Sequence, residues 1–226
     1  ALGNGGTVAR VDAVIFDFDG LILDTEWPAY VSVVEVFEDH GVELALTDWQ
    51  RRIGRGDNEP WPAMLETALG RPVDHDAVTE RRNLRKNAMT EANPVLPGCE
   101  ELLSEALRLG MATAVASSSS WSWVGGHLAR LGLLERFGAV RTSDDVERTK
   151  PWPDVYVAAA AALGVDRGRC VVLEDSRNGV LAAKEAGMYC VAVPNRVTAD
   201  LDFSEADLVV RSLADVDLAA LIGTRS

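Results

Sequence analysis

The sequence predicts an α/β protein with a Rossmann-like, doubly wound parallel sheet and a helical segment inserted after the first strand. Through the second half of the chain, short apolar runs alternate with helix-like segments, which is typical of a parallel sheet covered by helices on both faces. The first apolar run, residues 11–16, is separated from this alternation by a long stretch that looks helical throughout. Acidic or hydroxyl side chains follow several of the apolar runs directly, as expected where strands end at an open edge of a sheet.

The elements are expected in a regular order. Residues 11–16 form a buried strand that leads into a tight loop. Gly, Pro and Asp then separate four helix-like segments, at 29–40, 48–53, 61–69 and 75–91. Further helices are expected at 99–109, 121–131, 153–163 and 178–186, and strands at 111–116, 139–141, 170–173, 189–193 and 208–210, before a closing helix.

This order predicts two domains. The α/β core comprises residues 9–24 and 95–226, and a helical cap comprises residues 25–94. The hinges are expected near 23–26 and 93–97. With 226 residues, the chain is long enough to bury the core of a large domain beside a smaller insert.

Charge and composition exclude several classes of partner. The net charge of −13 argues against nucleic acid as a partner. No apolar run is long enough to cross a bilayer, so we expect no membrane partner. The three cysteines are widely spaced, which argues against a disulfide framework or a zinc cluster, so we expect the protein in the reducing cytoplasm. Separately, we expect a monomer. An acidic chain that binds an anionic substrate needs local positive charge, and a metal ion is a simple source of it.

The segment Asp17-Phe18-Asp19-Gly20 follows the first predicted strand. Asp and Gly are common in turns, so a plain turn is one interpretation. However, carboxylates at i and i+2 after a strand project toward the same side and would repel each other without a cation or a shared proton. The pair is therefore also typical of a metal site with divided acid and base roles.

Three other polar clusters have two interpretations each. The serines of residues 117–120 follow a predicted strand, and they would either cap the next helix or bind phosphate at its N-terminus. Lys150 lies in a loop before prolines that open a helix, either at the surface or facing a phosphoryl group. Glu174 and Asp175 follow another strand, either as helix-capping residues or as ligands of Mg²⁺.

Taken together, these clusters resemble the motifs of the haloacid dehalogenase superfamily over residues 11–193. The matching segments are Asp17-x-Asp19-Gly20-x-x-x-Asp24-Thr25-Glu26, Ser117, Lys150-Pro151 and Glu174-Asp175-Ser176-x-x-Gly179. The helical insert is similar to the small α-helical (C1-type) cap of the branch that includes β-phosphoglucomutase and phosphatases.

The resemblance implies a phosphatase acting on a small phosphorylated metabolite, such as a sugar phosphate, through an aspartyl-phosphate intermediate. Asp17 is implied as the nucleophile and Asp19 as the general acid and base. The implied Mg²⁺ ligands are Asp17, Asp19, Glu174 and Asp175, and the implied phosphate-binding residues are Ser117, Ser118, Lys150 and Gly20. True dehalogenases of this superfamily lack the second acid of the pair, so Asp19 favours phosphoryl transfer.

We expect the cap to select the substrate. The candidate residues for its inner face are Arg52, Arg55, Trp27, Trp61 and Arg82. The segment 52–56 resembles the substrate-specificity loop of this branch, although arginines in a cap are also common on a solvated face.

Three alternatives remain open. A sugar-phosphate mutase of the β-phosphoglucomutase type fits the motifs, but such mutases have a histidine just after the Asp-Thr pair, and residues 24–30 contain none. A phosphonatase needs a cap lysine, and nothing in the sequence around Lys86 suggests that it is activated. A catalytically silent binding protein on the same fold would be expected to lack Asp17 or Asp19.

Overall fold

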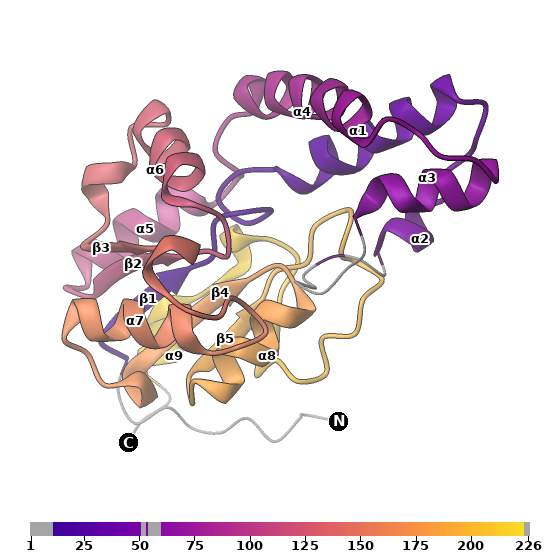
Figure 1. Ribbon diagram of the computed structural model, residues 1–226. Coiled ribbons are helices and arrows are strands. Elements are labelled where there is room, and N and C mark those ends of the chain that lie inside the picture. Colours follow the sequence, from indigo (N-terminus) through magenta and orange to yellow (C-terminus); the bar gives the residue numbers. More distant parts are fainter. Residues whose placement is uncertain (1–10, 51–52, 54–59, 224–226) are drawn as a thin grey trace.

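The computed structural model describes residues 11–50, 53 and 60–223, and these residues contain a parallel sheet of six strands (Figure 1). The strands are β1 (Ala13–Phe16), β2 (Ala112–Ala116), β3 (Ala139–Arg141), β4 (Cys170–Glu174), β5 (Tyr189–Ala192) and β6 (Leu208–Val209). Their order is β3-β2-β1-β4-β5-β6, with β1 in the middle. The chain winds outward on one side of β1 and then on the other, so the carboxyl ends of β1, β2 and β4 flank a crevice where ligands bind in such sheets.

Helices cover both faces of the sheet. On one face lie α5 (Cys99–Arg108), α6 (Trp121–Arg130) and α9 (Leu218–Gly223), and on the other lie α7 (Asp154–Leu163) and α8 (Arg177–Glu185). Alternate residues of β1 point to opposite faces of the sheet. Val14 and Phe16 pack into the apolar cluster under α5, α6 and α9, and Ala13 and Ile15 pack into the cluster under α7 and α8. The predicted doubly wound α/β fold is confirmed.

A separate layer of helices lies over one end of the sheet (Figure 1). It consists of α1 (Glu26–Asp39), α2 (Leu46–Gln50), α3 (Trp61–Leu69) and α4 (His75–Ala92), which we call the helical layer. This layer has its own apolar cluster, which includes Val33, Phe37 and Leu65. Between α1 and α4, the described residues contain no strand, and none of the described helices has the length and apolarity to cross a membrane.

The helical layer is joined to the core by its two connecting segments and by side-chain and loop contacts. The two connecting segments lie side by side, because Leu23 and Val95 form an antiparallel bridge and the Asn93 amide donates to the Asp24 carbonyl at 2.8 Å. The loop after β5 supplies another contact: Val197 is buried in the apolar cluster of the helical layer, and its carbonyl accepts a hydrogen bond from Gln50 Nε2 at 2.8 Å. The domain boundaries at 24/25 and 94/95 remain a prediction.

Most element boundaries agree with the sequence-based ones to within two residues. The main difference is α1, which begins at Glu26 instead of residue 29. Pro28 lies in its first turn, where proline needs no hydrogen-bonded N–H, so it does not delay the helix. Helix α2 ends at Gln50, and the rest of the predicted segment falls on residue 53, a turn, and on residues outside the described ones.

Candidate active site

The polar clusters predicted from the sequence meet at the carboxyl ends of the strands. Asp17 follows β1, Ser117 follows β2, and Glu174 and Asp175 lie at the end of β4. The Asp17 amide donates to the Leu173 carbonyl at 2.9 Å, which continues the β1–β4 pairing to the site itself. Parallel strands end at one edge of the sheet, and this is why residues distant in the sequence converge here.

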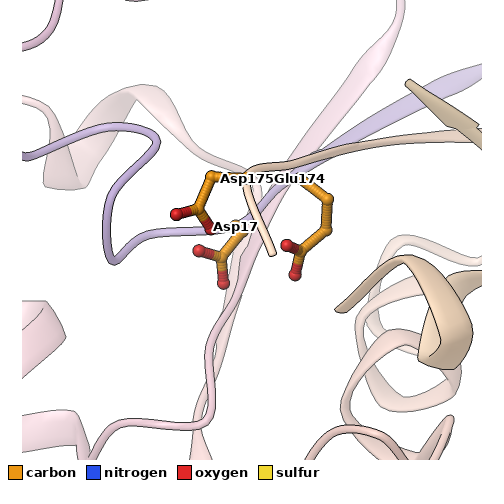
Figure 2. Close-up of side chains that lie close together, drawn as sticks. All are labelled: Asp17, Glu174 and Asp175. Atoms are coloured by element: carbon orange, nitrogen blue, oxygen red, sulfur yellow. The ribbon is translucent and has the colours of Figure 1, made fainter. Parts of the chain in front are cut away.

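Three buried carboxylates form an acidic cluster. The candidate ligand oxygens of Asp17, Glu174 and Asp175 all lie within 4.8 Å of one another, and Figure 2 shows the Asp17 carboxylate between the other two. Burial raises the pKa of Asp17 and of Asp175 well above the usual value, and the charge of Glu174 adds to both shifts. A divalent cation would relieve this repulsion, and oxygen ligands of this kind suit a hard cation. The cluster therefore fits a metal ion.

Lys150 is the cationic centre of the site. Its ammonium group is buried and forms ion pairs with Asp17 and with Glu174, the latter at 2.6 Å. Burial opposes the charge of this lysine, but Asp17 and Glu174 outweigh it and hold the Lys150 pKa above its ordinary value. An acidic chain thus presents a permanent positive charge beside Asp17.

Glu174 is fully engaged in hydrogen bonds. Its Oε1 accepts from Lys150 Nζ and from the Tyr156 hydroxyl at 2.7 Å, and its Oε2 accepts from both the amide and the hydroxyl of Ser176 at 2.9 Å each. Gly179 makes this possible, since an added Cβ there would overlap the Glu174 carboxylate. In this geometry Glu174 positions Lys150. Tyr156 was not predicted, because one tyrosine within a helical pattern carries no signal for a site.

The Asp19 carboxylate is held by three donors. Its Oδ2 accepts from Ser117 Oγ at 3.1 Å and from Ser119 Oγ at 2.7 Å, and its Oδ1 accepts from Trp123 Nε1 at 2.8 Å. Two serines of the run after β2 therefore hold Asp19, whereas Ser120, at the N-cap of α6, makes no side-chain capping hydrogen bond. The role of Trp123 was missed, because its sequence position in a predicted helix does not show which way the indole faces.

Asn195, in the loop after β5, is a further residue that the sequence did not indicate. Its Nδ2 donates to Asp175 Oδ2 at 2.7 Å and to the Gly20 carbonyl at 3.3 Å. Gly20 has a φ of 79°, and an added Cβ would overlap Asp175. Gly20 does not line the cavity described next, so its contact in the structure is with Asp175 and Asn195.

A cavity of about 690 Å³ lies between the strand ends and the helical layer. Its floor includes Asp17, Asp19, Ser117, Ser118, Lys150 and Asp175, and its roof includes Glu26, Trp49, Trp61, Arg82 and Lys86. The helical layer thus faces the acidic cluster with a mixture of indole rings and charged groups.

The predicted substrate-binding residues are distributed unevenly. Trp61 and Arg82 line the cavity. Trp27 does not; its ring packs against Tyr30 and lies 4.0 Å from the Arg196 guanidinium. Arg52 and Arg55 lie outside the described residues.

Lys86 requires a correction, because nothing in the sequence suggested a special environment for it. It lines the cavity, and its ammonium group lies 3.9 Å from the centre of the Trp123 ring. Burial lowers its pKa, and the neighbouring Arg82 lowers it further. Arg82 and Lys86 lie four residues apart on α4 and therefore on one helix face. This spacing was the feature of the sequence that could have placed Lys86 beside Arg82.

The fold and the site together define an α/β enzyme with a buried carboxylate cluster and a lysine at the carboxyl edge of its sheet, enclosed by a helical layer. Residues 11–187 match the family model of the haloacid dehalogenase-like hydrolases. The match spans most of the sequence, and the chain belongs to this family.

Similar proteins agree with this assignment. The chain is 43% identical over 212 residues to "Putative phosphatase YhcW" of Bacillus subtilis (strain 168), covering 94% of this chain and 96% of that protein. It is 30% identical over 237 residues to hexitol phosphatase B of Escherichia coli (strain K12), and the match covers 96% of this chain and 99% of that protein. One similar solved structure is that of CbbY from Rhodobacter sphaeroides in complex with xylulose-(1,5)bisphosphate. It superposes with a TM-score of 0.71 at 27% identity, and the match covers 93% of this chain and 99% of that chain.

Proposed function

We propose that the chain is a Mg²⁺-dependent phosphatase that hydrolyses a small, sugar-phosphate-like monoester through an aspartyl-phosphate on Asp17. The observation that carries the proposal is the position of Asp17, which lies on the floor of the cavity against Lys150 and within the acidic cluster. The names of the Bacillus subtilis and Escherichia coli relatives describe phosphatases, and this supports the reaction class.

The first step is transfer of the phosphoryl group to the protein. An Asp17 carboxylate oxygen attacks phosphorus in line, the bond from phosphorus to the ester oxygen breaks, and Asp19 gives its proton to that oxygen. Lys150 and the donors at Ser117 and Ser118 neutralise and orient the phosphoryl oxygens. Charge stabilisation and positioning of this kind dominate phosphoryl transfer.

The second step releases phosphate. Asp19 takes a proton from a water molecule, the water oxygen bonds to phosphorus, and the bond between phosphorus and Asp17 breaks. The proton is then available on Asp19 for the next ester. With the Ser117 hydroxyl turned to the phosphoryl group, the hydrogen bonds from Ser119 and Trp123 keep the Asp19 carboxylate in place.

The acidic cluster would hold the Mg²⁺. Asp17 and Asp175 would supply carboxylate oxygens and Asp19 its backbone carbonyl. Glu174, whose two oxygens already accept four hydrogen bonds, would act by positioning Lys150. When bound, the ion supplies positive charge to the phosphoryl oxygens and to the carboxylates.

A panel of phosphate esters tests the proposal. We expect phosphate release with Mg²⁺ and none in EDTA, and we expect Asp17→Asn to abolish release while the protein remains folded. Phosphate release at the wild-type rate from Asp17→Asn would contradict the proposal.

Two further results would favour the alternatives. Glucose 1-phosphate with a glucose bisphosphate primer tests the mutase, and isomerised hexose phosphate without free phosphate would favour it. No turnover of any ester by the wild type would favour a silent binding protein.

A further inference from the structure

The Trp123 side chain connects Asp19 to the helical layer. Its Nε1–H donates to Asp19 Oδ1 at 2.8 Å, and the ammonium group of Lys86 lies 3.9 Å from the centre of its ring. Trp123 belongs to α6 of the core, whereas Lys86 belongs to α4 of the helical layer. One indole thus lies between a carboxylate at its edge and a cation over its face.

A neighbouring histidine fixes the position of this indole. The His127 ring packs edge-to-face against the Trp123 ring, with the two centroids 4.4 Å apart and the planes at 79°. His127 is itself buried, stacks on the Phe18 ring and accepts from Arg130 Nε at 3.3 Å. This packing keeps the N–H of the indole turned toward Asp19.

Lys86 differs from the other two lysines of the chain in its partners. Lys150 and Lys184 both form salt bridges with carboxylates. Lys86 forms no salt bridge with any carboxylate that the structure describes, and the Trp123 ring is the direct partner of its charge. A cation over an indole face is attracted by the ring quadrupole, and more strongly where the pair is shielded from water.

The two contacts of Trp123 reinforce each other. The cation draws π-electron density toward the ring face that it covers, which leaves the N–H more positive and makes it a better donor to a carboxylate. Charges and hydrogen bonds polarise one another in this way at low dielectric. An indole N–H is also a donor only, so it holds Asp19 Oδ1 equally well whether or not Asp19 carries a proton.

We propose that Trp123 and Lys86 are positioning residues for Asp19, and that Lys86 acts on Asp19 through the indole of Trp123. Ser119 holds Asp19 Oδ2 at 2.7 Å, and the Lys86–Trp123 pair holds the other oxygen. The inference rests on the proposed phosphatase function and assigns the groups that orient its acid and base.

Esters with different leaving groups test the role of Trp123. An alkoxide leaves with the proton that Asp19 gives it, whereas p-nitrophenolate is a stable anion that leaves without one. Trp123→Phe keeps a ring and removes the N–H. It should lower kcat/KM about 10–100-fold for the fastest alkyl phosphate of the ester panel, and less than about threefold for p-nitrophenyl phosphate. It should lower kcat for both esters, because Asp19 also activates the water in the second step.

Substitutions at Lys86 test the route through the indole. Lys86→Met removes the charge and should lower kcat/KM for the alkyl phosphate about 2–5-fold, as expected of one cation–π contact. Lys86→Arg keeps the charge and should restore the value. In the Trp123→Phe background, Lys86→Met should have no further effect, because the N–H through which it acts is missing. Additive losses would mean that Lys86 acts on the substrate directly, and they would overturn this route.

Two matched variants control for general effects. Trp121→Phe makes the same change at an exposed position of α6. Arg71→Met removes a cation at an exposed position between α3 and α4. Neither should change the ratio of kcat/KM between the two esters. Equal losses for the two esters in Trp123→Phe would overturn the positioning role.

NMR of the indole N–H groups tests the same contacts without turnover. The signal that disappears in Trp123→Phe should move to a lower proton shift in Lys86→Met, because its hydrogen bond weakens, and should stay in place in Lys86→Arg and Arg71→Met. A signal that does not move in Lys86→Met would overturn the inference, whether or not the wild type releases phosphate. Absence of phosphate release from every ester, including p-nitrophenyl phosphate, would instead refute the phosphatase function.

Discussion

Glu26 occupies an unusual place for a carboxylate, partly buried at the start of α1 and facing the cavity. Burial and the charge of Asp19 raise its pKa to about 7, while Lys86 and Arg82 act in the opposite direction. The folded chain therefore keeps a proton on Glu26 at pH values where an unfolded chain has lost it. This single residue links the charge of the cavity to the pH dependence of stability.

The first prediction concerns that link. Because the Glu26 pKa is higher in the folded chain than its ordinary value of 4.5, unfolding releases a proton, and stability falls as pH rises from about 4.5 to about 7. Glu26→Gln lacks this titration. In EDTA, the Tm of Glu26→Gln should therefore exceed that of the wild type by more at pH 8 than at pH 5. Each kcal/mol of difference in unfolding free energy corresponds to a Tm difference of about 2–4 °C for a chain of this length. Differential scanning calorimetry would show this, and Glu43→Gln, at an exposed position in the helical layer, is the control. A Tm difference that does not change with pH would contradict the prediction.

Asn195 gives the second prediction. Asn195→Ala removes the amide that donates to Asp175 Oδ2, so the carboxylate loses its orientation toward the acidic cluster. The Mg²⁺ concentration for half-maximal turnover should rise about 10-fold or more, as for other partners of metal ligands. KM for the ester should change much less, which a purely structural defect would not produce. Asn87→Ala, at an exposed position of α4, is the control, and an unchanged Mg²⁺ requirement would contradict the role.

At the residue scale, the sequence predicted those groups that stand at strand ends. Asp17, Ser117 and Asp175 could be found because an apolar run followed by a polar residue marks the edge of a parallel sheet. Tyr156, Asn195 and Trp123 could not, because they lie inside helices or in a loop. Their roles depend on how those elements are rotated and packed, which local patterns do not encode.

At the element scale, the close approach of α8 to β4 controls the site. Gly179 lies in the first turn of α8, and its amide donates to Ser176 Oγ at 3.1 Å. The missing side chain leaves the space that the Glu174 carboxylate fills. Helix position and lysine position are therefore coupled, because Glu174 is a partner of Lys150.

A pair of glycine substitutions tests this coupling. Gly179→Ala should destabilise the protein by about 1–3 kcal/mol, because the new methyl group must displace a buried, hydrogen-bonded carboxylate. Gly126→Ala, in α6, meets open space and should stabilise by about 0.5–1 kcal/mol. Urea unfolding measures both, and equal effects of the two substitutions would contradict the account.

The helices and strands themselves were largely predictable, because periodicity and the turn residues mark them. The sequence did not show which face of each helix lies against the cavity and which lies against solvent. Arg82 and Lys86 share one face of α4, but an exposed face and a face over a cavity have the same pattern. The direction of that face follows from packing between α1 and α4 and from the attachment of Val197, both of which are tertiary contacts.

At the scale of the whole molecule, the three cysteines lie within the packed core. Cys99, Cys170 and Cys190 are free and buried. Burial raises the pKa of Cys99 to about 12 and that of Cys170 to about 11, and it also raises that of Cys190. Their reactivity therefore reports on opening of the core.

A thiol-labelling experiment follows from this arrangement. Dithionitrobenzoate should leave the native chain unmodified at pH 8 over the time in which it labels all 3 cysteines in denaturant. Labelling rates at intermediate urea concentrations should follow the loss of helical signal. Rapid labelling of any cysteine in native buffer would contradict the packing described for β4, β5 and α5.

The overall architecture was also predictable, since strand–helix alternation with one helical interruption permits few alternatives. The sequence also predicted a cap with Trp61 and Arg82 on its inner face, and both residues line the cavity. Trp49 and Glu26 line it as well, and the sequence did not predict them, because local patterns do not show which way a side chain faces.

The central claim is that Asp17 is the nucleophile. Its most direct test is a rapid acid quench during turnover with Mg²⁺, followed by peptide mass mapping. The account predicts one phosphoryl group on the peptide that contains Asp17. This group should disappear once the ester has been consumed, and it should be absent in Asp17→Asn. A phosphoryl group on a different residue, or steady turnover by Asp17→Asn at the wild-type rate, would contradict it.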